Sequence, residues 1–158
     1  MLSKPEHGWT EFSLGKTIYP LSYLTDIPTD WLDEAIHGLQ NLTPFSVHGC
    51  CEPGRMICTV SYWNCHILFE DEGRSVLSKE DTRWEIAHIS MLQFCRAMHK
   101  DISENIEQWC VWLPGSADST RNRKTSDAAK CNLQTKLAQL RKLIEVRESR
   151  FGEDRCFL

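Results

Sequence analysis

The strongest constraint on the fold is a run of alternating apolar and polar residues between positions 45 and 70. Successive side chains of a strand point to opposite faces, so such alternation predicts strands that each bury one face. Pro53 and Gly54 suit the central positions of a type II turn, and Trp63-Asn64 allows a second reversal. The alternating stretches cover residues 45–51, 56–62 and 65–70. Together they predict a three-stranded antiparallel meander.

Two strands and a short helix are predicted ahead of this meander. The strands cover residues 9–14 and 18–25, and Pro20 makes the second an edge strand, because proline cannot donate a hydrogen bond to a neighbour. Thr29 can cap a helix whose apolar residues continue at helical spacing to Leu39. With the meander, these elements predict an α+β fold in which an antiparallel sheet of about five strands packs on helices.

A long amphipathic helix is predicted after the meander. A loop over residues 71–79 and a capping-box-like spacing over 78–81 precede it, and Pro114-Gly115 ends it. Its apolar residues recur at steps of three or four, the spacing of one helix face. They are Trp84, Ala87, Met91, Phe94, Met98, Ile102, Ile106, Trp109 and Leu113. Such a stripe can cover a sheet and still offer a platform for the C-terminal segment.

The C-terminal segment is set apart by its charge. Residues 1–119 hold 8 Lys or Arg against 17 Asp or Glu, whereas residues 120–158 hold 10 against 5. We divide the chain into an α+β domain (1–113), a linker or exposed loop (114–126) and a C-terminal amphipathic helix (127–152). The charge break predicts a folded unit joined to a helix that contacts something else.

The predicted C-terminal helix carries one apolar stripe of about two heptads. Its members are Leu133, Leu137, Leu140 and Ile144. Because so short a stripe cannot hold a coiled coil alone, it needs the long helix of the same chain, a second copy or a foreign protein. We expect docking within the chain or a homodimer through this stripe. Nucleic-acid binding by the basic residues is an alternative, although acidic residues interrupt them and the net charge is −4.

Composition favours a globular protein of the cytoplasm. At 158 residues, with 41% hydrophobic and 25% charged residues, the chain can bury one core. No apolar run reaches the about 18–20 residues that cross a bilayer, and the first residues lack the apolar stretch of a signal peptide. Most of the eight cysteines fall inside predicted strands or a helix, where a reduced thiol acts as a small apolar side chain. We therefore expect free thiols, a cytoplasmic location and no membrane contact.

Cysteines and histidines gather in the meander, which makes a metal site an alternative. The group comprises His48, Cys50, Cys51, Cys58, Cys65 and His66. If the hairpin pairs Cys51 with Met56, three of these cysteines point into the core while both histidines point outward, which divides the possible zinc ligands. Cys95 and His99 share a helix face, but no orienting third group accompanies them. We expect no cofactor and no catalytic residue, and the alternative is a small metal-binding protein or enzyme centred on this group.

Protein binding is the function that we predict. Acidic residues gather around the first helix, where they can attract a basic partner, and aromatic residues at strand edges or off the main stripes can anchor it. The partner-binding residues expected on these grounds are Asp26, Asp30, Asp33, Glu34, Tyr19, Tyr23, Trp63 and Trp112. The layout of strands, helix, meander and long helix is similar to that of small immunity and anti-defence inhibitor proteins, including some anti-CRISPRs. This resemblance of architecture implies a non-enzymatic inhibitor or regulator.

Overall fold

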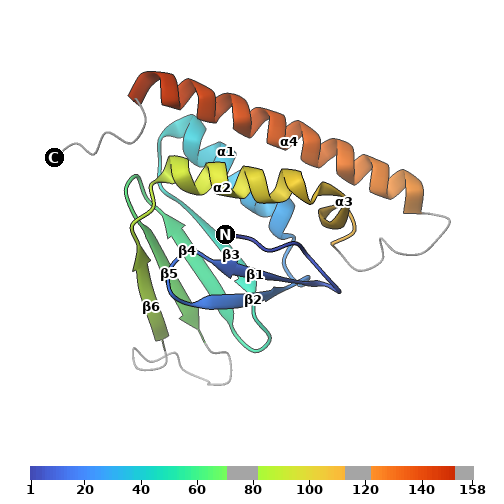
Figure 1. The fold of residues 1–158 in the computed structure, drawn as a ribbon, viewed down its shortest axis with the longest axis horizontal. Helices are drawn as coiled ribbons and strands as arrows, with labels where there is room; N and C mark the ends of the chain where they lie inside the picture. The colour runs from blue at the N-terminus through green and yellow to red at the C-terminus, as the bar shows by residue number, and fades with distance from the viewer. Residues whose placement is uncertain (71–81, 113–121, 152–158) are drawn as a thin grey trace.

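The predicted meander is present, and it continues into a fourth strand (Figure 1). The computed structural model describes residues 1–70, 82–112 and 122–151. Their elements are β1 (Trp9–Ser13), β2 (Ile18–Ser22), α1 (Ile27–Asn41), β3 (Phe45–Cys50), β4 (Arg55–Val60), β5 (Cys65–Glu70), β6 (Thr82–Ala87), α2 (Met91–Glu104), α3 (Ile106–Trp109) and α4 (Asn122–Phe151). The strands form two antiparallel sheets, one in the order β3-β4-β5-β6 and one of β1 with β2. The α+β class is confirmed, with two sheets in place of one.

Strand pairing in the β3–β4 hairpin is shifted by two residues from the predicted register. Met56 lies opposite Gly49 rather than opposite Cys51. The turn is centred on Glu52 and Pro53, which a cis peptide bond joins, rather than on the type II turn predicted one residue later. Because a shift by an even number of residues keeps every side chain on its face, the predicted inward and outward faces of this hairpin are correct.

The N-terminal strands form a separate hairpin on the inner face of the four-stranded sheet, which is the face that also meets α1 and α2. A close approach to Gly49 of β3 allows this packing, because a Cβ atom there would lie only 2.9 Å from the side chain of Leu21. Further along, the rings of Tyr19 and Phe69 stack with centroids 6.0 Å apart. Pro20 pairs with β1 alone among the described residues, as expected for an edge strand.

The predicted long helix is wrong in its first part. Residues 82–87 form strand β6 along β5, and helix α2 begins only at Met91. A capping box starts α2: the hydroxyl of Ser90 accepts a hydrogen bond from the backbone N–H of Gln93, whose side chain accepts one from the backbone N–H of Ser90. Trp84 fitted the helical stripe by spacing alone, although it lies on a strand.

The helical region is also interrupted near its end. Helix α2 stops at Glu104, and the single turn of α3 begins at Ile106 after the non-helical residue Asn105. The predicted loop and capping spacing at residues 71–81 and the predicted stop at residues 114–115 lie outside the described residues.

Helix α1 begins earlier than predicted. Its first residue is Ile27, Asp26 occupies the N-cap position, and Pro28 lies in the first turn. Proline is tolerated there because the first N–H groups of a helix have no partner within the helix. Thr29 therefore belongs to the first turn and does not cap the helix.

Helix α4 is longer than predicted and packs on the rest of the chain. It begins at Asn122, so residues 122–126 of the predicted linker are helical, and it ends at Phe151. Figure 1 shows α4 running along α1 and α2 on the side away from the sheet, and both helices contact it. The chain thus has three layers, which are the four-stranded sheet, the hairpin with α1 and α2, and α4.

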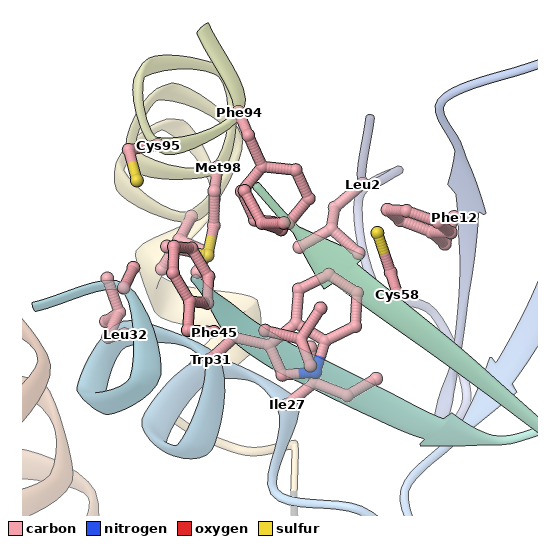
Figure 2. Close-up of a cluster of buried hydrophobic side chains, with 14 of the residues drawn as sticks. Leu2, Phe12, Ile27, Trp31, Leu32, Phe45, Cys58, Phe94, Cys95 and Met98 are labelled. Atoms are coloured by element: carbon pink, nitrogen blue, oxygen red, sulfur yellow. The ribbon is translucent and has the colours of Figure 1, made fainter. Parts of the chain in front are cut away.

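One continuous hydrophobic core joins these layers. Figure 2 shows labelled side chains from β1, α1 and α2 converging over the four-stranded sheet. Trp31 packs edge to face against Phe12 with ring centroids 5.4 Å apart, and Phe45 meets Phe94 in a similar geometry at 5.9 Å. The indole N–H of Trp31 donates a hydrogen bond to the carbonyl oxygen of His48 at 2.8 Å, which ties α1 to β3. The apolar stripe of α4 belongs to the same core.

Candidate protein-binding surface

The outer face of the four-stranded sheet, which points away from the hairpin and the helices, carries a row of apolar side chains. Leu68 of β5 lies directly opposite Ile57 on one side and Trp84 on the other. Directly opposed side chains have Cβ atoms about 4.5–5.5 Å apart, so Leu68 is within contact range of both Ile57 and Trp84. Ile86 follows on the same face of β6, because side chains two residues apart on a strand share a face.

Two of these side chains are exposed despite their size. Trp84 is 67% exposed and Ile86 is 42% exposed, while Ile57 and Leu68 are half-buried. We call Ile57, Leu68, Trp84 and Ile86 the outer apolar row. The side chains on the solvent-facing side of a sheet are ordinarily polar. Contiguous apolar side chains on that side therefore indicate an interaction surface.

Polar side chains on β3, β4 and β5 flank the outer apolar row, which reaches the margin of the sheet at β6. They are Ser46, His48, Arg55, Thr59, His66 and Glu70. Two cross-strand contacts hold part of this rim in place: the hydroxyls of Ser46 and Thr59 lie 2.9 Å apart, and Arg55 forms an ion pair with Glu70. An apolar centre with a polar rim is the usual composition of a protein–protein contact surface.

The inner side of β6 carries two charged residues whose side chains are held in position. The carboxylate of Glu85 accepts hydrogen bonds from the backbone N–H of Lys16 at 3.1 Å and from the hydroxyl of Tyr19 at 3.2 Å. The guanidinium of Arg83 lies 4.6 Å from the ring centroid of Phe69. Burial raises the pKa of the Tyr19 hydroxyl above its ordinary value, and the negative charge of Glu85 adds to this effect. These contacts join the N-terminal hairpin to the margin of the large sheet.

A small pocket of about 210 Å³ lies beside these charges, between β2 and the ends of β5 and β6. Its wall includes Tyr19, Phe69, Arg83 and Glu85. Pockets for small-molecule ligands or cofactors usually measure about 300–1,000 Å³. The size of this pocket therefore gives little support to a substrate site.

The predicted acidic residues come together at the start of α1, but α4 already contacts them. Asp33 forms an ion pair with Lys136 of α4. Burial and the nearby charge of Asp26 raise the pKa of the Asp30 carboxyl above its ordinary value, whereas His48 and Lys136 act in the opposite direction. Glu34 is exposed on the same helix. The acidic cluster is thus partly compensated within the chain.

The predicted aromatic anchors do not form one surface. Tyr19 and Trp112 are buried, so neither offers its ring to a partner, and the indole N–H of Trp112 donates to the carbonyl oxygen of Thr25 at 2.7 Å. Tyr23 is half-buried against Gly8. Only Trp63, at the β4–β5 turn, is largely exposed, at 56%.

The predicted self-association stripe is buried within its own chain. Leu133, Leu137, Leu140 and Ile144 all belong to the core and pack where α4 meets α1 and α2. This is one of the three arrangements that the sequence left open. A second copy could reach these side chains only if α4 left its place on the other two helices.

Basic residues of α4 also find acceptors in the same chain. Lys130 pairs with Glu107, and Arg147 donates hydrogen bonds to the carbonyl oxygens of Leu39, at 2.6 and 2.9 Å, and of Gln40, at 2.8 Å. These contacts reduce the basic surface that could bind nucleic-acid phosphates. Together with the pair of Lys136 and Asp33, the pair of Lys130 and Glu107 shows that the basic helix and the acidic body contact each other.

The cysteine-rich group does not gather metal ligands in the described residues. Cys51, Cys58 and Cys65 are buried on the inner face, whereas His48 and His66 are exposed on the outer face. In the part of the chain that the structure describes, no three or more His, Cys, Asp or Glu side chains stand close enough to hold a metal ion.

Cys95 and His99 also lack the features of a catalytic pair. Burial raises the pKa of the Cys95 thiol far above its ordinary value, so it stays protonated and inaccessible. The pKa of His99 is lowered by burial and by Arg141. A buried thiol that cannot ionise is a poor nucleophile.

No protein-family model, curated protein or solved structure matches this chain. Among the described helices, none combines the length and the apolar character that a bilayer span requires.

The outer apolar row was missed by the sequence-based reasoning, although the sequence contains a signal for it. The stretches predicted as strands have a large apolar residue on each face, as in Met56-Ile57 and Leu68-Phe69. Only one of these faces can point into the core. The second apolar face could therefore have been recognised as a candidate contact surface before the structure was known.

Proposed function

We propose that this chain is a non-enzymatic protein-binding module that contacts its partner through the outer face of the four-stranded sheet. The observation that supports this most strongly is the outer apolar row, whose member Trp84 is 67% exposed. Large aromatic side chains dominate the binding energy of many interfaces, especially when polar residues surround them. The partner that fits this surface is a protein whose own contact surface is apolar at its centre.

We further propose that the protein acts inside the cell as an inhibitor or regulator. Every cysteine in the described residues is a free thiol, including the buried Cys58, Cys65 and Cys95, as is typical of a reducing compartment. An inhibitor or regulator needs a contact surface rather than a catalytic constellation, and the surface described above meets that need. A fluorescent fusion should therefore distribute through the cytoplasm, and its recovery in the secreted fraction would contradict this part of the proposal.

The binding proposal can be tested by capture from an extract of the source cells. The tagged chain is compared with W84S, which removes the most exposed side chain of the outer apolar row, and with L24S as a matched control. Leu24 is 61% exposed but lies between β2 and α1, away from the row. The captured partner is then purified, and its affinity for each variant is measured by calorimetry.

We expect W84S to weaken binding at least tenfold, because loss of a large aromatic anchor from an interface costs about 2 kcal/mol or more. L24S should bind within about twofold of the unsubstituted chain. Both substitutions are at exposed positions, so each should change the free energy of unfolding by less than about 0.5 kcal/mol. A thermal-unfolding measurement that confirms this excludes misfolding as the cause of weaker binding. If W84S captures the same protein with unchanged affinity, the outer face is not the contact surface.

A further inference from the structure

Strand β6 forms one margin of the four-stranded sheet, and its outer edge is unpaired in the described part of the chain (Figure 1). An edge strand presents backbone N–H and C=O groups that can pair with another strand. Proteins often protect such edges with charged residues, and β6 carries Arg83 and Glu85 on its inner side, but it also carries the exposed apolar residues Trp84 and Ile86 on its outer side. The edge therefore has the features of a strand that pairs with a second strand in solution.

The charges on β6 are arranged so that the strand is complementary to a copy of itself. Arg83 and Glu85 share the inner side of the strand, two residues apart, and Trp84 lies between them on the outer side. Within the described residues, neither Arg83 nor Glu85 forms an ion pair, although the contacts to Phe69, Tyr19 and Lys16 hold both side chains in place.

We propose that two copies of this chain pair through their β6 edges in an antiparallel, two-fold symmetric arrangement centred on Trp84. Arg83 of each copy then lies directly opposite Glu85 of the other copy, and the two Trp84 side chains face each other. The same patch serves on both subunits, as a two-fold interface requires. This inference does not depend on the proposed function, because self-pairing and partner binding are measured separately.

The side-chain pattern selects this register over its neighbours. A shift that places Trp84 opposite Glu85 of the second copy joins the outer face of one subunit to the inner face of the other, and sets an apolar ring against a carboxylate. A shift by two residues in either direction sets Arg83 opposite Arg83, or Glu85 opposite Glu85, and like charges directly opposite each other destabilise a strand pair. Only the proposed register forms two ion pairs and one aromatic pair.

Pairing in this register joins the two sheets into one that runs through both subunits. Their outer apolar rows then become continuous across the two-fold axis. Two short strands bury less area than a standard stable interface, so we expect a weak dimer with a dissociation constant on the order of 10 µM or above. The equilibrium should therefore be followed over a wide range of protein concentration.

The first test is a charge swap followed by sedimentation velocity of the full chain from about 10 µM to 1 mM. R83E sets carboxylate against carboxylate at two symmetric places, and E85R sets guanidinium against guanidinium, so each should weaken the dimer about tenfold or more. The double variant R83E/E85R restores opposite charges in the same register and should recover the affinity to within about threefold of the unsubstituted chain. A dimer that R83E leaves unchanged, or a chain that stays monomeric at 1 mM, would overturn the proposal.

Because Glu85 also binds the N-terminal hairpin, E85R could disturb the fold. The second test therefore leaves Glu85 unchanged. In a C131S background, which removes an exposed cysteine, W84C is compared with I86C under mild oxidation. Position 84 faces itself across the proposed axis, at a distance that a disulfide can span, whereas position 86 faces position 82. W84C should cross-link to a dimer several times faster than I86C. Equal rates in the two variants, or no cross-linked dimer, would refute this register.

Discussion

Replacement of Leu140 by alanine tests the docking of α4 on its own chain. Leu140 is fully buried in the stripe that packs against α1 and α2. Removal of a buried leucine side chain costs its transfer free energy and leaves a cavity, which together destabilise a protein by about 2.5–5 kcal/mol. Because both neighbouring helices belong to the well-packed core, little collapse is expected, and we predict a loss of about 3–4 kcal/mol for L140A.

The loss can be measured by urea unfolding followed by circular dichroism. For a chain of this length, a change of 1 kcal/mol shifts the midpoint of thermal unfolding by about 2–4 °C, so L140A should melt roughly 6–15 °C lower. Gln139, the residue before Leu140, is exposed and provides the control. The free energy of unfolding of Q139A should stay within about 0.5 kcal/mol of that of the unsubstituted chain.

The same variant separates docking within the chain from docking between copies. If the stripe is buried in its own chain, L140A loses stability while its mass in solution stays equal to that of the unsubstituted chain. A loss below about 1 kcal/mol, or a fall in mass caused by L140A, would show that the stripe is not buried within its own chain.

Three further predictions concern an ion pair, a histidine and two cysteines. The ion pair of Lys136 and Asp33 should be weak, so K136E should lower the free energy of unfolding by up to about 1 kcal/mol. The double variant D33K/K136E should recover part of this loss in a double-mutant cycle. A coupling free energy of zero would contradict the pairing. Burial and Arg141 lower the pKa of His99, so the unfolded chain takes up a proton at this residue more readily than the folded protein does. The contribution of neutral His99 to stability is therefore complete above about pH 6.5 and is lost as the pH falls below that value. In urea unfolding at pH 5.5 and 7.5, H99Q should be less sensitive to acid than the unsubstituted chain, and an equal pH dependence of the two would exclude the effect. Cys131 is exposed, whereas Cys95 is buried and its thiol pKa is raised. In a reaction with Ellman's reagent, C131S should therefore remove one rapidly reacting thiol and C95S should remove none. A rapid phase that C95S reduces would show that the reagent reaches the buried face of α2.

The sequence was most informative where periodicity and burial agree. Alternation predicted the meander and the correct faces of its strands, because one face of each strand enters the core. Helical spacing identified the members of the α4 stripe, which are Leu133, Leu137, Leu140 and Ile144 and are all buried. Periodicity could not tell which surface covers that stripe, since it reports a buried helix face but not the element that packs on it.

Strand β6 was misread because its apolar residues face solvent. Trp84 and Ile86 lie on the outer face, so β6 lacks the inward apolar alternation by which the other strands were recognised. Its residues also fit the spacing of the helix that follows. The pair Ser90 and Gln93 held the missing signal, because a capping box marks the first turn of a helix and so separates α2 from β6.

The candidate surface depends on pairing across strands, which the sequence did not provide. Ile57, Leu68 and Trp84 are distant in sequence, and only the register of β4, β5 and β6 makes them neighbours. The acidic residues of α1 lie near one another, but the contact of Asp33 with Lys136 could not be deduced before α4 was placed. Each of these contacts results from tertiary structure rather than from a local pattern.

The most direct test of protein binding through the outer face is hydroxyl-radical footprinting of the chain with and without its captured partner. We predict that oxidation of Trp84 and Leu68 falls several-fold in the complex, while that of Leu24 and of Val146 on α4 stays unchanged. Leu24 and Val146 are exposed at 61% and 39%, so both report on surfaces away from the outer face. Protection of Val146 or Leu24 with undiminished oxidation of Trp84 would show that the partner binds elsewhere.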